Sequence, residues 1–454
     1  MATDPRDGSV QGDLANALEV IDPLTVRFSI NPGAHFHPDD QGLARPLNGE
    51  DIQRDFLRRR TEGDYLFDRV IERSDAQRDS VTLHLKAPFA LLFELLGAPE
   101  ASVRSGETST AFDAPLGSGP FIPTQREGDR LALARHPLYH QQGYPRLEGV
   151  MLTRFATEGD WAASFAAGEL DVWVRSGPPG PGTPARADVS RAVRPATRLR
   201  GLGLSLLGQR GDVAVRHVEA FQDQRVRRAL ALALNRSALL APDSVTSGPV
   251  GPAHVADALP PDELAEHELY RWDAREARSL LSAAGQAGLE FRLQIPDVEP
   301  MRTYGQLIGD QLTAAGFEPR PQVTDLKAWQ TSFGAGDFEA IVFEIGGLNT
   351  PDIGLRLHTA SGVDGRFSLW GYSNPVYDAA VREALSTLNP AERAQRSRVA
   401  QRLLLDDVPA MLPISAPTEA AAIASGVRGF AFGAYDFNAG WLSAAWEHHE
   451  APGS

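Results

Sequence analysis

The sequence contains no cysteine, and only two of its basic residues are lysines, Lys86 and Lys327. Without cysteine the chain can form no disulfide, no thiolate metal site and no cysteine nucleophile. It also has no run of about 18 apolar residues, so we expect no transmembrane helix. Residues 1–20 are acidic and polar and lack the basic and apolar regions of a signal peptide. We therefore expect either that an export signal has been removed or that the protein is cytoplasmic.

Catalytic signatures are missing as well. The sequence has no G-x-S-x-G nucleophile elbow, no Walker A loop and no H-E-x-x-H helix. Adjacent carboxylates such as Asp39 and Asp40 do not face each other on a helix or a strand, so we interpret them as surface charge. His35 and His37 would share one face of a strand, a spacing that zinc can use. From these residues we predict a protein that is not an enzyme and that needs no cofactor.

The balance of charge excludes another class of function. The formal net charge is −15 at pH 7, whereas binding to nucleic acid depends on positive charge that neutralises phosphates. We therefore expect no nucleic-acid partner for this chain. The hydrophobic fraction of 42% and the charged fraction of 23% are ordinary for a soluble globular protein. With 454 residues, the chain is long enough for two or three lobes with separate cores.

The segment Pro115–Phe121, with the sequence PLGSGPF, predicts a tight turn, because two glycines flank a serine and a proline follows. Residues 124–134 mix charged and aliphatic side chains in the pattern of a half-buried strand. The sequence HPLY follows at His136–Tyr139. This combination resembles the P-x-G-T-G-P-Y … R-N-P-x-Y signature of the family 5 extracellular solute-binding proteins, the peptide- and nickel-type receptors of bacterial ABC importers.

Further segments resemble motifs of the same family, in the family's order. They are Leu24–Phe28 with Gly33–His37, Pro46–Ile52, Ala167–Val172, Arg225–Leu230 with Ala233–Arg236, and Ser373–Asp378. In the family the Phe-His pair, here Phe36 and His37, is part of the packing of a lobe, so the resemblance implies no metal site at the two histidines. The matches extend over residues 20–415, which is most of the chain.

Hydrophobic periodicity predicts the elements between these motifs. Helices are expected at residues 51–62, 90–96, 160–167, 223–240, 274–284, 304–315 and 390–405. Strands are expected at residues 81–85, 148–155, 290–294, 318–323 and 340–344. Asp273 stands where an N-cap would begin a helix, and Gly168 stands where a helix would end. The alternation of helices and strands after residue 246 argues for an α/β lobe.

The resemblance implies an α/β protein with the two-lobed periplasmic-binding-protein-like fold, of type II and similar to cluster C. The N-terminal part of lobe I is expected to be missing from this sequence. Residues 1–114 would form the family-specific lobe II. Residues 115–245, together with 430–454, would form lobe I, and residues 246–429 would form an α/β lobe III.

The resemblance also implies a function. Family members capture a solute in a cleft between lobes and deliver it to an ABC permease, so we expect a small polar solute or a peptide as the ligand. The protein would be a monomer in the periplasm or outside the cell. Three parts of the chain map to the cleft, residues 198–207, residues 344–352 and Tyr435, and their candidates for ligand contact are Arg200, Glu344, Asn349, Asp352 and Tyr435. Trp173, Trp370 and Tyr372 lie close to matched motifs and are candidates for stacking on a ligand. For the aromatic side chains, packing in a core is the alternative.

One departure from the family pattern bears on the ligand. In the oligopeptide receptors a tryptophan is followed, three residues on, by an aspartate that pairs with the α-ammonium group of the peptide. This sequence has Glu344 and Gly347 at those positions. A buried ammonium group without a carboxylate partner is costly. Unless Glu344 takes over the role, we expect that the ligand is not held through an α-ammonium group.

Several segments resemble a cytoplasmic branch of the family, the solute-binding-like C-terminal domain of the sugar-phosphate stress transcription regulators. They are Ile21–Phe28 with Pro32–His37, Asp325–Trp329 and Ala434–Trp441. The missing signal peptide fits this branch. The alternative function is therefore a cytoplasmic ligand-sensing domain, without the winged-helix domain that precedes it in those regulators.

Overall fold

The computed structural model describes residues 2–3, 10–98, 101–109, 112, 114–176, 188–240, 244–346, 350–363, 365–430, 432 and 446–448. The chain divides into two compact units. Unit 1 comprises Met1–Arg194 and Ala420–Ser454, and unit 2 comprises Pro195–Glu419. The three-region division predicted from the sequence has its boundaries elsewhere, at residues 114–115, 245–246 and 429–430, and it stays a prediction.

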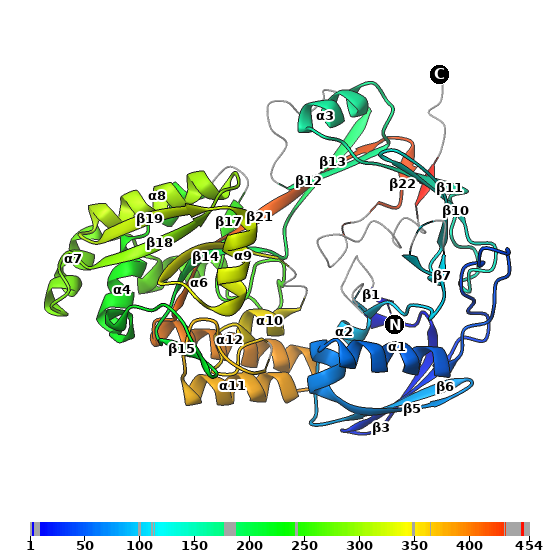
Figure 1. Ribbon diagram of the computed structural model, residues 1–454, viewed down its shortest axis with the longest axis horizontal. Coiled ribbons are helices and arrows are strands. Elements are labelled where there is room, and N and C mark those ends of the chain that lie inside the picture. Colours follow the sequence, from blue (N-terminus) through cyan, green and yellow to red (C-terminus); the bar gives the residue numbers. More distant parts are fainter. Residues whose placement is uncertain are drawn as a thin grey trace. The chain divides into compact units, whose positions relative to one another are not determined.

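An antiparallel sheet in the order β3-β4-β6-β5 organises the N-terminal part of unit 1 (Figure 1). Its strands are β3 (Ala15–Asp22), β4 (Thr25–Ile30), β5 (Ile71–Gln77) and β6 (Ser80–Leu85). Side chains alternate along β4 and β6, so that Phe28 and Leu83 are buried on one face of the sheet. Helix α1 (Gly49–Thr61) joins the same hydrophobic core through Ile52 and Phe56.

The start of α1 is fixed by a capping box. The side chain of Asn48 accepts a hydrogen bond from the backbone N–H of Asp51, and the Asp51 carboxylate accepts one from the backbone N–H of Asn48, both at 3.1 Å. Gly49 follows, where a Cβ atom would stand 2.0 Å from the carbonyl oxygen of Gln77. Only glycine allows this close approach of the start of α1 to the β5–β6 turn. The observed bounds of α1 confirm the helix predicted at residues 51–62.

A second sheet of unit 1 follows the predicted turn. Strands β9 (Phe121–Glu127), β10 (Arg130–Arg135) and β11 (Gly149–Thr153) are antiparallel neighbours. The single strand predicted over residues 124–134 is therefore wrong, because Gly128, with a φ of 55°, reverses the chain between β9 and β10. Helix α3 (Glu158–Ala166) ends before Gly168, which has a φ of 80°, as the sequence predicts.

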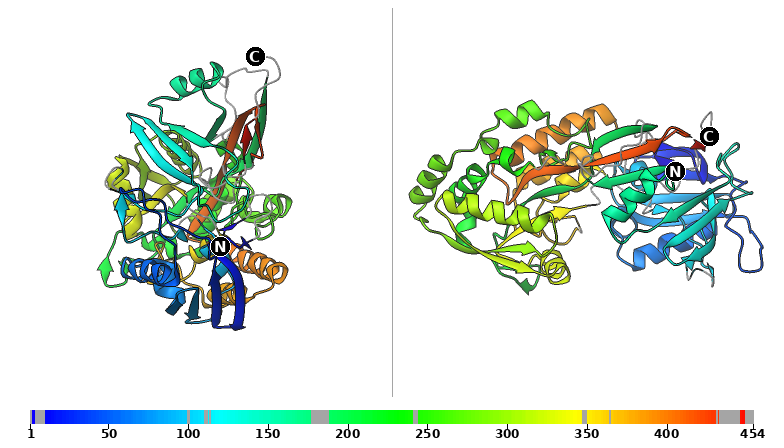
Figure 2. Two further views of the ribbon diagram at one scale, coloured as in Figure 1. Left: turned by 90° about the vertical axis from the view of Figure 1, so that its right-hand side faces the viewer. Right: turned by 90° about the horizontal axis from the view of Figure 1, so that it is seen from above.

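Shorter elements complete unit 1: β1 (Ala2–Thr3), β2 (Val10–Gln11), η1 (Leu66–Val70), α2 (Leu92–Leu96), β7 (Thr108–Ser109), β8 (Ala114–Pro115), β12 (Val172–Ser176), β13 (Val189–Pro195), β22 (Val427–Arg428) and β23 (Glu447–His448). Strands β12 and β13 pair with β21 (Met411–Ala424). β21 is the long orange-red strand of Figure 2, and its last residues belong to unit 1. Most of the Gly/Pro-rich segment at residues 176–184 lies outside the described residues.

Unit 2 contains a mixed sheet. Strand β14 (Leu199–Leu204) lies between β20 (Ala340–Ile345) and β21 and is antiparallel to both. Strand β18 (Glu290–Pro296) is parallel to β19 (Glu318–Thr324) and to β20. Every residue of β14 is buried, so this strand lies in the middle of the packed sheet. The short β17 (Ser244–Thr246) pairs with β21.

The long helices of unit 2 confirm the predicted α/β alternation after residue 246. Helix α7 (Ala274–Ala283) starts after Asp273, whose carboxylate accepts a hydrogen bond from the backbone N–H of Glu276 at 2.8 Å. Helix α8 (Met301–Ala314) lies beside β18 and β19 in Figure 1. The remaining elements of unit 2 are β15 (Gln209–Arg210), β16 (Val213–Ala214), η3 (Glu219–Gln222), α6 (Pro261–Glu266), η4 (Glu268–Tyr270), α9 (Leu326–Ala335), α10 (Pro351–Arg356), α11 (Pro375–Ser386) and α12 (Pro390–Asp406).

One predicted helix of unit 2 is wrong in its extent. In place of a continuous helix over residues 223–240, the chain forms α4 (Gln224–Ala233) and a separate short helix α5 (Arg236–Leu239). The side chain of Asn235 accepts a hydrogen bond from the backbone N–H of Ala238 at 3.2 Å. This local cap competes with the continuation of α4 and starts a new helix.

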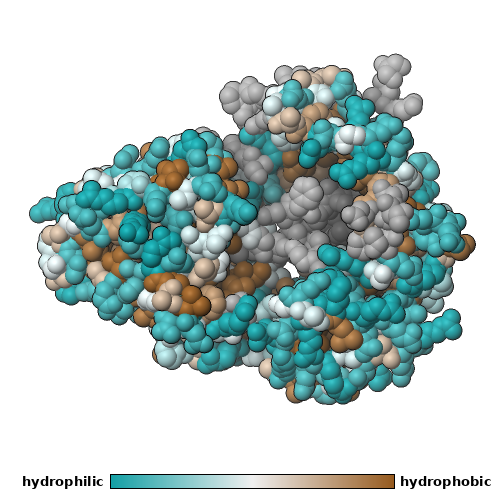
Figure 3. All heavy atoms as spheres, viewed as in Figure 1, coloured by the Kyte–Doolittle hydropathy of each residue, from teal (hydrophilic) through white to brown (hydrophobic). Residues whose placement is uncertain are grey.

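On the face shown in Figure 3, hydrophilic residues predominate and apolar residues occur in scattered groups. Among the residues described, no helix is both long enough and apolar enough to cross a membrane.

Candidate functional site

Arg200 and Glu344 stand opposite each other in adjacent strands of unit 2. The register of β14 and β20 pairs them directly, and Nε of Arg200 lies 2.7 Å from Oε2 of Glu344. The Arg200 side chain is 5% exposed and that of Glu344 is 20% exposed. Two residues that the sequence predicts separately as ligand contacts thus form one ion pair with access to solvent on the glutamate side.

Arg198 extends this pair into a larger group. Its Nη1 lies 3.1 Å from Oε1 of Glu344, and its Nη2 lies 3.9 Å from Oε1 of Glu419. Arg198 and Arg200 are two residues apart, and side chains at that spacing share one face of an extended chain. Both guanidinium groups therefore reach the same carboxylate. We refer to Arg198, Arg200, Glu344 and Glu419 as the charged cluster.

A pair of hydroxyl groups lies next to the charged cluster. Oη of Tyr304, on α8, is 3.5 Å from Oγ of Ser415, which is the β21 neighbour of Arg200 in the sheet register. Burial raises the pKa of Tyr304 to about 12, although the contact with Ser415 and the charge of Arg200 act in the opposite direction. The phenol therefore stays protonated at neutral pH and can donate a hydrogen bond.

The charged cluster combines two guanidinium groups with two carboxylates, so its formal charges cancel. An ammonium group that approached Glu344 would compete with two guanidinium groups for the same carboxylate. A carboxylate or phosphate that approached Arg198 would compete with Glu344. A charged ligand group can therefore bind here only by replacing one of the charge-assisted hydrogen bonds within the cluster.

Trp370, another predicted ligand contact, is packed in the core of unit 2. Its indole lies against β14 at Gly203, where a Cβ atom would stand 2.2 Å from Cζ3 of the ring. The indole Nε1 donates a hydrogen bond to the carbonyl oxygen of Leu357 at 2.8 Å, and the ring of Phe343 is 5.7 Å away between centroids. The side chain is fully buried. Packing thus accounts for every contact we observe, and a ligand contact stays a prediction.

Tyr372 and Asp352 are also buried and already have polar partners. Oη of Tyr372 donates a hydrogen bond to Oδ2 of Asp407 at 2.5 Å. The Asp352 carboxylate accepts a hydrogen bond from Nε of Arg356 at 2.9 Å and another from the hydroxyl of Thr350. Both side chains therefore link segments of unit 2 to each other, and their role toward a ligand stays a prediction.

Trp173 belongs to unit 1 and lies on β12. It is 2% exposed and packs with Phe165 and Ala422, and the ring of Trp161 is 4.6 Å away between centroids. Its Nε1 donates no hydrogen bond to the part of the chain that the structure describes. The two remaining candidates, Asn349 and Tyr435, lie outside the described residues, as does Gly347.

The predicted turn at Pro115–Phe121 brings two histidines together in unit 1. Nε2 of His37 and Nδ1 of His136 both donate hydrogen bonds to the carbonyl oxygen of Gly119, at 3.0 and 3.1 Å. The two rings meet edge to face, with centroids 5.0 Å apart. Nδ1 of His35 instead donates to the carbonyl oxygen of Gly33 at 2.9 Å. In the described ranges, no group of three or more His, Asp or Glu side chains could hold a metal ion.

Sequence reasoning did not single out Arg198 and Glu419. Arg198 carried a usable signal, because an arginine two residues before Arg200 faces the same side wherever the chain is extended. Glu419 carried none. It reaches the charged cluster only because β21 pairs with β14, and the sequence does not show which strands become neighbours.

Comparisons with known proteins agree with this fold. The family model of the bacterial extracellular solute-binding proteins, family 5 middle, matches residues 9–365. Protein XP55 of Streptomyces lividans is 26% identical, over 87% of this chain and 74% of the relative. The di/tripeptide-binding protein 2 of Pseudomonas aeruginosa (strain UCBPP-PA14) is 26% identical, over 91% of this chain and 82% of the relative.

Solved structures resemble the whole chain. HbpA2 from Haemophilus parasuis gives a TM-score of 0.77 at 15% identity, covering 99% of this chain and 92% of that one. DppA from Helicobacter pylori, in complex with the peptide STSA, gives a TM-score of 0.74 at 16% identity, covering 98% and 91%. At such identities the likeness shows the fold, and it confirms the periplasmic-binding-protein-like fold predicted from the sequence. Because the family model also matches most of the sequence, the chain belongs to family 5 of the bacterial extracellular solute-binding proteins.

Proposed function

We propose that the protein captures a small polar solute or a peptide for an ABC importer. The observation that carries this proposal is the family match over residues 9–365, which includes Arg198, Arg200 and Glu344. Similar proteins point the same way: they include the di/tripeptide-binding proteins 1 and 2 of Pseudomonas aeruginosa and the glutathione-binding protein GsiB of Escherichia coli (strain K12). An ABC permease as partner, a monomeric state and a location in the periplasm or outside the cell belong to the same proposal. The ligand-sensing alternative stays a prediction.

The charged cluster supports a narrower statement about the ligand. Glu344 is the carboxylate that could neutralise the α-ammonium group of a peptide, and two arginines already bind it, at 2.7 and 3.1 Å. An ammonium group would have to displace at least one of these charge-assisted hydrogen bonds. We therefore expect that the ligand is not held through an α-ammonium group and that free-amino di- and tripeptides bind weakly or not at all.

The general function is tested by ligand-dependent stability and shape. A library of polar solutes and peptides is screened for thermal shifts, and hits are followed by small-angle scattering. A bound ligand at a hundredfold excess over its Kd stabilises the protein by about 2.7 kcal/mol, and closure of the lobes on it lowers the radius of gyration. No thermal shift with any compound, together with an unchanged radius, would contradict the proposal.

The statement about the ligand group is tested separately by calorimetry. Matched tripeptides, one with a free amino terminus and one N-acetylated, are titrated into the wild-type protein and into Glu344→Gln. We expect no preference for the free amine in either protein. Submicromolar binding of the free-amino peptide that Glu344→Gln abolishes would overturn this part and leave the solute-binding function intact.

A further inference from the structure

Unit 1 contains a pocket of about 270 Å³ that shares no residue with the charged cluster. It lies between the inner face of the β3-β4-β6-β5 sheet, helix α1, residues 96–98 and 101–103, and residues 117–120. Residues 117–120 belong to the turn that the sequence singles out. The pocket is therefore framed by well-defined elements of one unit.

Small residues keep this space open. Protein interiors leave few voids larger than a water molecule. Part of this pocket is lined by Ala15, Gly97, Ala98, Ala101 and Gly119. Larger side chains at these positions would close it. At Gly119, an added Cβ atom would meet nothing within 4 Å. The pocket thus results from the choice of residues around it.

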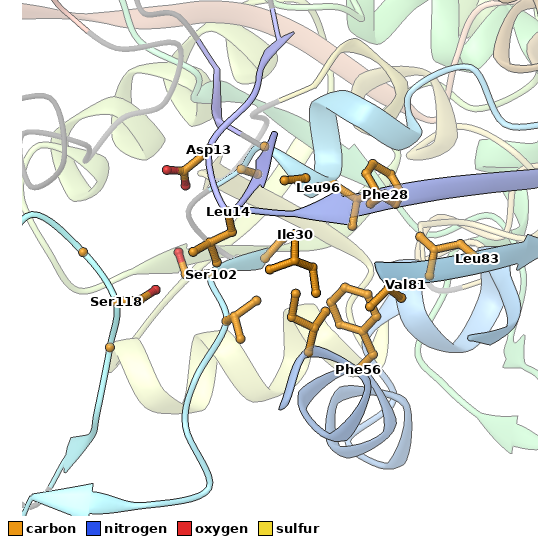
Figure 4. A pocket seen from close by; sticks show the side chains of 18 of the residues that line it. Asp13, Leu14, Phe28, Ile30, Phe56, Val81, Leu83, Leu96, Ser102 and Ser118 are labelled. Carbon is orange, nitrogen blue, oxygen red and sulfur yellow. The ribbon is translucent and has the colours of Figure 1, made fainter. Parts of the chain in front are cut away.

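One end of the pocket is apolar. Phe28, Val81 and Leu83 from the sheet and Phe56 from α1 point into it, as Figure 4 shows. An apolar cavity of about 150 Å³ is large enough to bind benzene. The whole pocket is larger, at about 270 Å³, so it has room for an apolar group of about the size of benzene together with a polar head group.

The other end is polar and carries a carboxylate. Figure 4 shows Asp13, Ser102 and Ser118 at this end. Oδ1 of Asp13 accepts hydrogen bonds from Nε2 of His140 at 2.7 Å and from Nε2 of Gln141 at 3.1 Å. Oδ2 of Asp13 accepts none from the residues that the structure describes, and the side chain is 25% exposed. The carboxylate is thus held in place through one oxygen and is open to a ligand through the other.

The surroundings of Asp13 keep its carboxyl group ionised and therefore negatively charged. Burial by itself would raise the pKa of the Asp13 carboxyl, but several interactions, led by the hydrogen bond and charge of His140 and including the hydrogen bond of Gln141, hold that pKa below its usual value. Burial and the nearby Asp13 charge raise the pKa of the Tyr139 hydroxyl, so the phenol that lines the pocket stays neutral. At neutral pH the polar end therefore presents an ionised carboxylate beside hydroxyl groups.

We propose that this pocket is a second ligand site, which takes a small amphipathic amine with its ammonium group on Asp13 and its aliphatic or aromatic tail among Phe28, Phe56 and Leu83. The proposal rests on the juxtaposition of an open carboxylate with an apolar recess of matching size. It is independent of the solute captured by the protein, because no residue of the charged cluster takes part.

The test compares three probes with the same tail: hexylamine, hexan-1-ol and hexanoate, each titrated calorimetrically into the full chain. A charge-assisted hydrogen bond distinguishes the amine from the alcohol by about ten- to hundredfold in affinity. We therefore expect hexylamine to bind most tightly, hexan-1-ol more weakly and hexanoate not at all. Absence of binding by hexylamine, or equal binding of hexylamine and hexanoate, would overturn the proposal.

Two variants locate the binding. Asp13→Asn keeps an oxygen that accepts from His140 and Gln141, and it should weaken hexylamine about ten- to hundredfold while hexan-1-ol is unaffected. Ala101→Phe fills the recess and should weaken both probes. The matched control is Asp129→Asn, since this carboxylate is 58% exposed in the β9–β10 turn and pairs with Arg154. Unchanged hexylamine binding in Asp13→Asn, which preserves the local hydrogen bonds, would overturn the assignment even if Ala101→Phe did not fold.

Discussion

The side chains of Arg200 and Glu344 bind each other although the two residues are 144 positions apart in the sequence, with Nε of the arginine 2.7 Å from Oε2 of the glutamate. Strand register places them opposite each other, in β14 and β20. Because the Arg200 side chain is 5% exposed, water cannot readily replace its carboxylate partner. Removal of either partner alone would therefore take the compensating charge away from a group that has little access to water.

Replacement of Glu344 by glutamine should destabilise the protein. The change removes the charge that faces both Arg198 and Arg200, and we expect the free energy of unfolding in urea to fall by about 1–3 kcal/mol. The matched control is Glu290→Gln in the same unit. Glu290 pairs with Arg320, but both side chains are about 60% exposed, so its loss should cost less than about 1 kcal/mol. Equal losses in the two variants would show that the Glu344 pair is no stronger than a surface pair.

Replacement of Gly203 by alanine should also destabilise unit 2. The added methyl group would stand 2.2 Å from Cζ3 of Trp370, and the indole, packed against Phe333, Phe338 and Phe343, has little room to move. We expect a loss of about 1–3 kcal/mol, from overpacking, in the free energy of unfolding in urea.

The control for this prediction is Gly334→Ala. Gly334 lies in α9, where an added Cβ atom meets nothing within 4 Å. Alanine is the better helix former there, so the variant should be as stable as the wild type or more stable. If Gly203→Ala were as stable as Gly334→Ala, the indole of Trp370 would not be held against β14.

The sequence predicts the helices and strands of unit 2 well where the apolar pattern is long. Helices α7, α8 and α12 lie within a few residues of their predicted bounds. The wrong predictions have local causes that the spacing of apolar residues does not show. Asn235 starts a second helix by capping it, and Gly128 reverses a strand that the pattern treats as continuous.

The candidate site was predictable only in part. Arg200 and Glu344 were singled out through a family resemblance, and nothing in the sequence indicated that they bind each other. The burial of Trp370 depends on Gly203 in a strand far away in the chain, and Glu419 reaches Arg198 only through the pairing of β21 with β14. Contacts of this kind are set by tertiary packing, which a single sequence does not display.

The stability of unit 1 should fall on acidification because of His136. Burial, with a smaller contribution from the charge of His37, lowers the pKa of His136 from 6.5 to about 4. Between these two values the unfolded chain binds a proton that the folded protein excludes, so this contribution is complete above pH 6.5 and is lost as the pH falls toward 4. Between neutral pH and about pH 5, we expect a loss of about 2 kcal/mol in the free energy of unfolding.

The variant His136→Asn tests this pH dependence. Its amide nitrogen can still donate to the carbonyl oxygen of Gly119, which the wild-type ring binds through Nδ1 at 3.1 Å, but the side chain no longer titrates. We expect a lower stability at neutral pH, from lost packing against His37, and a smaller decline toward about pH 5. Parallel declines in the wild type and the variant would assign the acid sensitivity to other groups.

His358 should be replaceable by leucine with a gain in stability. Its imidazole is fully buried in unit 2, and neither ring nitrogen has a hydrogen-bond partner among the described residues. Burial lowers the pKa of His358 to about 3, so the folded state excludes the proton that the unfolded chain binds below its own pKa of 6.5. Leucine removes two unsatisfied polar atoms, and we expect His358→Leu to raise the free energy of unfolding in urea by about 1–2 kcal/mol at neutral pH. The difference in the free energy of unfolding between the variant and the wild type should grow by about 2 kcal/mol toward pH 5, because only the wild type has an imidazole that excludes a proton in the folded state.

His217→Leu is the control for this prediction, since the His217 side chain is 36% exposed and its replacement should change stability by less than about 0.5 kcal/mol. A His358→Leu protein less stable than the wild type at both pH values would show that the imidazole is satisfied in the folded chain.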